Sequence, residues 1–95
     1  MKLWNTARND DHDMKMNHKL LSNLEKIHTT ELGVMRIREN LGLDTDDVVK
    51  WCVQKTRQAD RIVRQGKNWY VYTGDAVITV NAHSYTIITA HRDKS

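Results

Sequence analysis

Histidine, threonine and asparagine gather near the end of this chain, in segments with a strand-like period. His91 and Thr89 share one side of the segment Tyr85–Arg92, because strand side chains alternate between two faces. The preceding segment, 77–81, sorts in the same way, with Asn81 on its polar side. An imidazole accepts or donates a proton near neutral pH, and amides and hydroxyls can bind phosphate or a base. The pattern indicates a polar sheet face suited to binding or cleaving a phosphodiester.

Basic and aromatic side chains extend this candidate site, since cations offset charge on a phosphate and a tyrosine ring stacks on a base. The candidate catalytic residues are His91, His28 and Lys67, and the candidate binding residues are Arg36, Arg64, Tyr70, Asn81, Thr89 and Arg92. Structural alternatives remain open: a solvated edge histidine for His91, a hairpin residue for Lys67, and a helix-dipole partner for His28. Aromatic residues such as Tyr70 also favour strands for packing reasons alone.

Length and composition favour one small intracellular domain. The 95 residues suffice for a modest core, and the single Cys52, among valines, fits a buried apolar role better than a reactive thiol. No apolar stretch reaches membrane-spanning length, and the histidines lack metal-ligand spacing. We therefore expect a cytoplasmic protein without cofactor, metal or membrane association.

The net positive charge of the chain comes from residues 57–95. Residues 1–56 hold nine Lys/Arg and nine Asp/Glu, whereas residues 57–95 hold six Lys/Arg and three Asp/Glu, which accounts for the net charge of +3. A basic half suggests an anionic partner such as RNA, and a solvated charged rim is the alternative.

Three helices are predicted before residue 58. Residues 1–13 are polar and aperiodic and read as a flexible arm, and apolar residues then recur at helical spacing from 14 to about 28. Thr30 is a plausible N-cap for a second helix that ends at Gly42. The acidic run 44–47 starts a third helix that fades near residue 58.

Four strands follow, near 61–65, 67–72, 76–81 and 85–91, with turn residues between them. The order of elements predicts an α+β domain over 14–95, with about three N-terminal helices (14–58) packed on a four-stranded antiparallel sheet (60–92). The side chains expected to face the helices are Trp69, Val71, Ile78, Val80, Ile88 and Ala90. Exposed sheet edges also allow a homodimer, by edge pairing or helix packing.

The region from His28 to Arg92 resembles an uncharacterised family of small bacterial proteins, a domain of unknown function. The segments that carry the resemblance are 28–33, 36–37, 47–52, 66–71, 78–81 and 87–91. This resemblance implies relatedness and no established activity.

The chain also resembles, more distantly, the barnase–EndoU–colicin–RelE superfamily of ribonuclease toxins. A helix with a histidine and an arginine, followed by an antiparallel sheet that ends in Ile87-Ile88-Thr89-Ala90, carries the likeness. It implies metal-independent RNA cleavage, with His28, Arg36, Lys67, Asn81, Thr89 and His91 as the residues carried over.

Two functional hypotheses follow from the sequence. The first is an RNA-directed protein, in its catalytic form a toxin-like endoribonuclease that uses the open sheet face. The second is a non-enzymatic module that binds nucleic acid or a cognate protein, such as a phage- or defence-related regulator or inhibitor.

Overall fold

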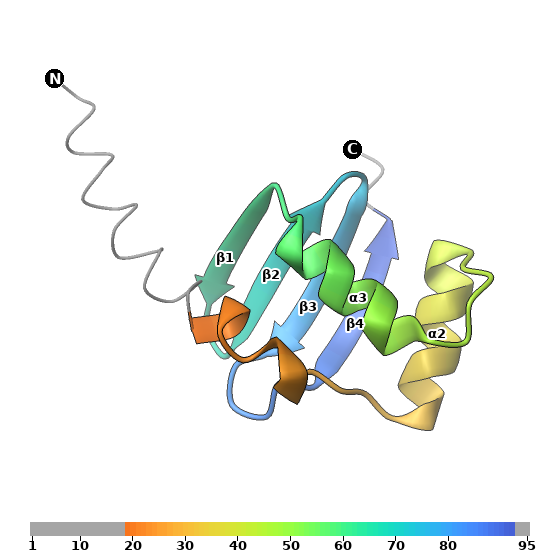
Figure 1. The fold of residues 1–95 in the computed structure, drawn as a ribbon, viewed down its shortest axis with the longest axis horizontal. Helices are drawn as coiled ribbons and strands as arrows, with labels where there is room; N and C mark the ends of the chain where they lie inside the picture. Colours follow the sequence, from red (N-terminus) through yellow and green to blue (C-terminus); the bar gives the residue numbers. More distant parts are fainter. Residues whose placement is uncertain (1–18, 93–95) are drawn as a thin grey trace, which may run out of the picture.

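The computed structural model describes residues 19–92 of the chain. Within this range, short helices precede a sheet of four strands, so the α+β fold class is confirmed (Figure 1). The elements are η1 (Leu24–Lys26), α2 (Glu31–Leu41), α3 (Val48–Arg57), β1 (Arg61–Gln65), β2 (Asn68–Thr73), β3 (Ala76–Asn81) and β4 (Ile87–Arg92). No helix among the described residues is long and apolar enough to cross a bilayer.

Helix α2 begins and ends where the sequence predicted. The Thr30 hydroxyl accepts a hydrogen bond of 3.0 Å from the Gly33 amide and thereby caps the first turn. Gly42 adopts a left-handed conformation (φ 65°) that terminates the helix, and its amide bonds back to the Arg38 carbonyl.

Helix α3 is set by its acidic start and by its apolar face. The Asp47 carboxylate accepts from the Lys50 amide at 3.1 Å, and this negative charge opposes the positive end of the helix dipole. The helix buries Val48, Cys52 and Thr56 against the sheet. The predicted third helix is therefore confirmed.

The four strands form an antiparallel meander in the order β1-β2-β3-β4. Two of its turns, at Gly66 and Gly74, need a left-handed residue (φ 61° and 59°), which glycine adopts without steric cost. Short connections and local pairing leave no long loop between the strands. Helix α3 crosses one face of the sheet, and α2 stands beside β4 (Figure 1).

The core lies between α3, α2 and one sheet face. Its largest fully buried side chain is Trp69, whose indole packs on Tyr85 at a centroid distance of 5.4 Å. The sheet side chains that are at most 2 % exposed are Trp69, Val71, Ile78, Val80, Ile87 and Ala90. This set confirms the predicted core face at five of its six positions.

The prediction is wrong at the sixth position, Ile88, because the register between β3 and β4 is irregular. Thr79 pairs with Thr89 but Val80 pairs with Ile87, so Ile88 is the extra residue of a β-bulge. Ile87 is therefore 2 % exposed and belongs to the core, whereas Ile88 is 52 % exposed. Strict alternation counted back from Ala90 had placed Ile88 inside.

The first predicted helix is also corrected within the described range. The arm 1–13 and the beginning of that helix lie outside this range, and the helical turn at 19–21 does not continue to residue 28. Asn23 has non-helical dihedrals (φ −128°, ψ 32°), and its side-chain amide donates to the Lys19 carbonyl at 2.7 Å. Because asparagine competes for backbone groups in this way, the helix breaks and resumes as the single 3₁₀ turn η1.

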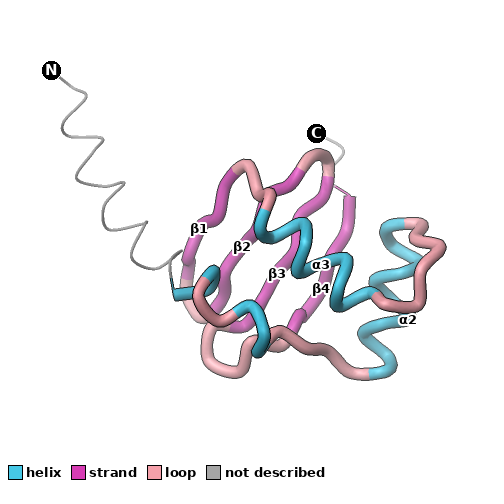
Figure 2. Tube along the Cα trace, in the orientation of Figure 1, coloured by secondary structure: helices cyan, strands magenta, loops and turns pink. Residues whose placement is uncertain are grey.

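Side chains from α2 and the segment before it satisfy carbonyl groups of β4. The Thr29 hydroxyl donates to the Ile87 carbonyl at 3.1 Å, and the Asn40 amide donates to the Ala90 carbonyl at 3.2 Å. Arg92 donates in turn to the Leu41 carbonyl at 2.7 Å. These bonds fix α2 along the edge of the sheet, where it runs beside β4 (Figure 2).

Gly33 is required by this attachment. A Cβ atom at position 33 would clash with the Thr29 hydroxyl oxygen, so Gly33→Ala must rotate Thr29 away from the Ile87 carbonyl. We expect Gly33→Ala to destabilise the fold by about 1 kcal/mol, because the lost bond outweighs the helix propensity of alanine near a helix end. Chemical denaturation measures this difference.

Thr29→Ala provides the matched background. This background removes the atom of the closest contact and leaves the Cβ atom of residue 29 and Thr30 Oγ1 at 3.3 Å, so Gly33→Ala should then cost clearly less than in the wild type. An equal cost in both backgrounds would contradict the proposed contact with the Thr29 hydroxyl.

Candidate nucleic-acid interface

The sheet surface that faces away from α3 is here called the open face. Strand pairing places eleven side chains on it in rows: Arg61, Val63, Gln65, Asn68, Tyr70, Tyr72, Val77, Thr79, Asn81, Thr89 and His91. Val77 is only 7 % exposed yet does not belong to the core cluster, because its neighbours on this second face cover it. The half-buried rings of Tyr70 and Tyr72 lie on β2, two residues apart and thus separated by about 7 Å along the strand.

The open face carries positive charge and no carboxylate. None of its eleven side chains is acidic, and Arg61 and His91 lie in the row that contains Tyr72 and Val77. The Arg61 guanidinium sits 5.1 Å from the centre of the Tyr72 ring, a cation–π contact that holds the charge above the face. Such a surface attracts anions and offers rings for stacking.

A chain of hydrogen bonds connects the open face to His28 at one end of the sheet. The Asn81 side-chain oxygen contacts the Ser84 hydroxyl (3.2 Å), which contacts the Thr86 hydroxyl (2.7 Å). The Thr86 hydroxyl contacts His28 Nε2 at 3.1 Å, and His28 Nδ1 lies 2.9 Å from the Lys26 carbonyl. Since a carbonyl only accepts, Nδ1 carries a proton, and Nε2 of a neutral His28 accepts from the Thr86 hydroxyl. The Ser84 and Thr86 hydroxyls then have two protons for three contacts, so in this form one contact between Asn81 and His28 is not a hydrogen bond.

The connection between β3 and β4 positions these hydrogen-bonding side chains, and its backbone is strained at Tyr85. Asn81 accepts from the amides of His83 and Ser84, both at 2.9 Å, and forms a tight turn. Tyr85 then adopts φ 62°, which is costly for a residue with a Cβ atom. Its carbonyl accepts from the His28 amide at 3.1 Å, and its ring is buried against Trp69, so packing supports the strained backbone.

The structure brings together some of the candidate residues named from the sequence. His28 and Asn81 belong to one hydrogen-bonded chain, and Lys67 lies beside them, because its carbonyl accepts from the Ala82 amide at 2.8 Å. Tyr70 and Thr89 lie in the middle row of the open face, on either side of Thr79.

Other candidates lie elsewhere. His91 is at the far end of β4, roughly 15 Å from His28 along the strand. Arg92 is held by Asp75 (2.8 Å) and by the α2 carbonyl, on the helix side. Arg64 also lies on the helix side, over the Trp69 ring at 5.7 Å, and Arg36 is exposed on α2. The two histidines therefore do not share one cleft.

Sequence reasoning missed three participants. The strand and turn pattern gives Ser84 and Thr86 no functional role, although hydroxyls next to a turn-forming asparagine are a recognisable signal. Arg61 begins β1, and its place on the open face follows only from the register with Tyr72.

The described part of the chain shows no group of three or more potential metal ligands. Burial raises the pKa of the Cys52 thiol from 9.0 to about 12, because the apolar surroundings disfavour the thiolate. Cys52 thus packs as a small apolar side chain in the folded protein.

Asn81 has a structural role that can be measured. Asn81→Ala removes the acceptor for two amides and a hydroxyl, so we expect a loss of about 1 kcal/mol in the free energy of unfolding. Asn81→Asp keeps the acceptor oxygen and should retain most of the stability. Thermal melts of both variants test this, and equal losses would show that the turn does not depend on that oxygen.

Comparison with known proteins places the chain by sequence. No curated protein and no solved structure matches it. A sequence family described as a protein of unknown function (DUF3781) matches residues 21–91, which include α2, α3 and nearly the whole sheet. The chain belongs to this family.

Proposed function

We propose that the protein binds single-stranded RNA on the open face. The observation that carries this proposal is a sheet surface with two tyrosine rings, a basic flank and no carboxylate. Aromatic rings on a strand stack on bases whatever their sequence, and nearby cations neutralise the phosphates that link them. Arg61 at one end and Lys67 at the other are exposed and frame the path of such a strand.

Polar side chains between the rings and the cations suit the edges of bases. Asn68 and Asn81 pair across β2 and β3, and the amide of Asn81 lies 3.5 Å from the Asn68 oxygen. This distance is at the limit of a hydrogen bond, so both amides can exchange it for a base edge. The open face therefore offers stacking, charge and hydrogen bonding together.

We further propose that the protein cleaves the RNA that it binds. In cleavage through the 2′-hydroxyl of RNA, that oxygen attacks the phosphorus, its proton passes to a base, and the 5′-oxygen leaves with a proton from an acid. His28 is the histidine best suited as the base, since the Lys26 carbonyl orients its ring and Nε2 faces a hydroxyl. Lys67, nearby and exposed, is suited to stabilise the charge on the phosphate.

Binding is tested with a fluorescent single-stranded oligoribonucleotide of mixed sequence and its duplex. Tyr70→Leu and Tyr72→Leu should each weaken single-strand binding about tenfold, because each removes one stacking ring. Arg61→Gln should weaken binding and reduce the salt slope by about 0.7, and Arg57→Gln, on the helix side, is the matched control.

Unchanged binding in all three open-face variants would show that RNA binds elsewhere on the protein. Lack of any binding at low salt would end the proposal, and capture of a protein partner in its place would favour the interaction module.

Cleavage is tested on total RNA with purified protein. We expect His28→Ala to abolish product formation with little change in the melting temperature. His91→Ala should still cleave at saturating RNA and at most bind RNA more weakly, because His91 lies on the open face at the far end of β4. Cleavage that is lost in His91→Ala and kept in His28→Ala would reverse this assignment. RNA binding without product in the wild type would leave a binding protein.

A further inference from the structure

Side-chain amides occupy the row of the open face that lies at the His28 end of the sheet. Gln65 pairs with Asn68 across β1 and β2, and Asn68 pairs with Asn81 across β2 and β3. Tyr70 lies in the next row, about 7 Å from Asn68 along β2. A base that stacks on the Tyr70 ring can therefore turn its edge toward the two asparagines.

The turn between β3 and β4 fixes the orientation of the Asn81 amide. Its Oδ1 atom accepts from the backbone amides of His83 and Ser84, both at 2.9 Å, and a backbone amide only donates. The oxygen is therefore committed to the turn, and the side chain cannot be flipped without loss of both bonds. Asn81 presents only its Nδ2 donor group to a ligand.

Asn81 in turn orients Asn68. The Asn81 Nδ2 atom lies 3.5 Å from Asn68 Oδ1, whereas a flipped Asn68 would place two NH₂ groups against each other. Asn68 Nδ2 then lies on the far side of its own oxygen, without a hydrogen-bond partner among residues 19–92. Read from Asn68 to Asn81, the groups are a donor, an acceptor and a donor. These three groups are called the asparagine array.

The array is complementary to the Watson–Crick edge of uracil. That edge carries an acceptor, a donor and an acceptor in order: O4, N3–H and O2. Cytosine, adenine and guanine can each match at most two of the three groups of the array. Uracil is thus the one standard RNA base that satisfies all of them.

We propose that Asn68 and Asn81 give the open face a preference for uridine in single-stranded RNA. The amide of Asn68 bonds two neighbouring groups of the uracil edge, Asn81 Nδ2 bonds the third, and the base stacks on Tyr70. An amide that turns freely adapts to any base, but the turn prevents this at Asn81. The inference rests on the proposed RNA binding and adds the base that the site selects.

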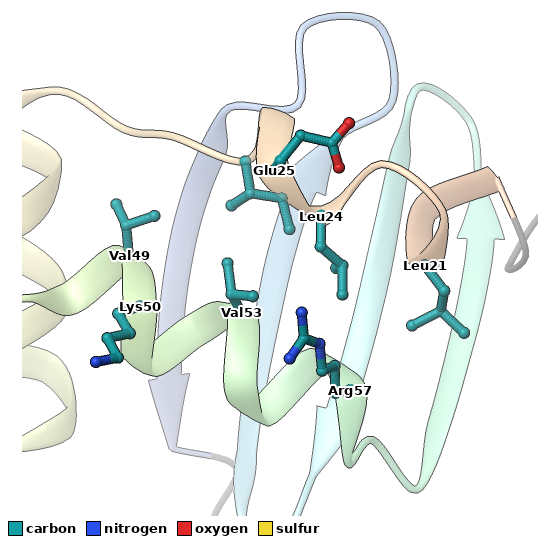
Figure 3. A pocket seen from close by; sticks show the side chains of 8 residues that line it. Leu21, Leu24, Glu25, Val49, Lys50, Val53 and Arg57 are labelled. Atoms are coloured by element: carbon teal, nitrogen blue, oxygen red, sulfur yellow. The ribbon is translucent and has the colours of Figure 1, made fainter.

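The helix side of the molecule has a groove that offers no such array. It has a volume of about 400 Å³ and runs between α3 and the η1 region, with Glu25, Lys50 and Arg57 as its polar lining residues (Figure 3). No asparagine or glutamine is among the described residues that line it. Cations there can contact phosphates but cannot distinguish bases, so Lys50→Gln is a suitable control.

Fluorescence anisotropy tests the preference with the full chain and single-stranded 2′-fluoro oligonucleotides of equal length. Their sugars lack the hydroxyl that attacks the phosphorus, so the proposed cleavage does not consume them. Oligo(U) should bind about fivefold more tightly than oligo(C), because it forms one more hydrogen bond. An oligomer of 3-methyluridine keeps the pyrimidine ring but lacks the N3 proton, and it should bind no better than oligo(C).

Two variants alter the array itself. Asn68→Asp replaces the outer donor by an acceptor, and it should bring the affinity ratio of oligo(U) to oligo(C) close to one. Asn81→Asp keeps the acceptor for the turn but removes the other donor, with the same expected result. Gln65→Glu is the matched control: it adds the same charge to the same row, outside the array, so it should weaken both probes and retain the ratio. Lys50→Gln should also retain it.

The outcomes separate the uridine preference from RNA binding. Equal affinity of the wild type for oligo(U) and oligo(C), or a ratio that persists in Asn68→Asp, would overturn the preference and leave the proposed RNA binding intact. A ratio that is also lost in Gln65→Glu would attribute the preference to charge and overturn the role of the array. Absence of binding to both probes and to the mixed-sequence strand would overturn RNA binding itself.

Discussion

The attachment of β4 to the segment 28–41 determines the rest of the architecture. An edge strand exposes unpaired backbone groups, which must be satisfied by water or by another element. Here the Thr29 hydroxyl and the Asn40 amide donate to carbonyls of β4, and the Ile87 amide donates to the His28 carbonyl at 2.8 Å. Because these bonds hold α2 beside the sheet, α2 does not cover the second face, and its outer side remains exposed. The exposure of the open face thus depends on one set of edge hydrogen bonds.

The bulge in β4 reconciles this attachment with a closed core. Between Thr79 and Val80 the register shifts, and the strand gains one residue relative to β3. Ala90 and Ile87 can then both face the helices, although they are three residues apart and strict alternation would place them on opposite faces. The displaced residue is Ile88, whose exposed side chain is the cost of bringing Ile87 inside. The same shift sets the position of Thr86, directly before β4, at which it meets His28.

Signals that act within one turn predicted the helices well, whereas features that depend on packing between distant segments could not be predicted. The Thr30 and Asp47 caps and the Gly42 terminator act within a single turn, so residue types alone located α2 and α3. The bulge could not be inferred, since Ile87 and Ile88 are chemically identical and only packing decides between them. The break at Asn23 was missed because the apolar period continues through it. The core role of Trp69 was predicted, because a large aromatic ring in a strand has few other favourable positions.

The candidate site was only partly predictable for the same reason. Candidate residues were chosen by type, and type does not reveal that Arg92 and Arg64 turn toward the helix side or that His28 and His91 lie at opposite ends of β4. The small number of acids in the sheet half was visible in the sequence. Its two described carboxylates, Asp60 and Asp75, lie outside the open-face rows. Asp60 accepts from the Gly74 amide, and Asp75 pairs with Arg92. Because both acids lie at one end of the sheet, the rows of the open face that hold Tyr70 and Tyr72 contain no carboxylate. The proposed binding of an anion to the open face depends on this separation of charge.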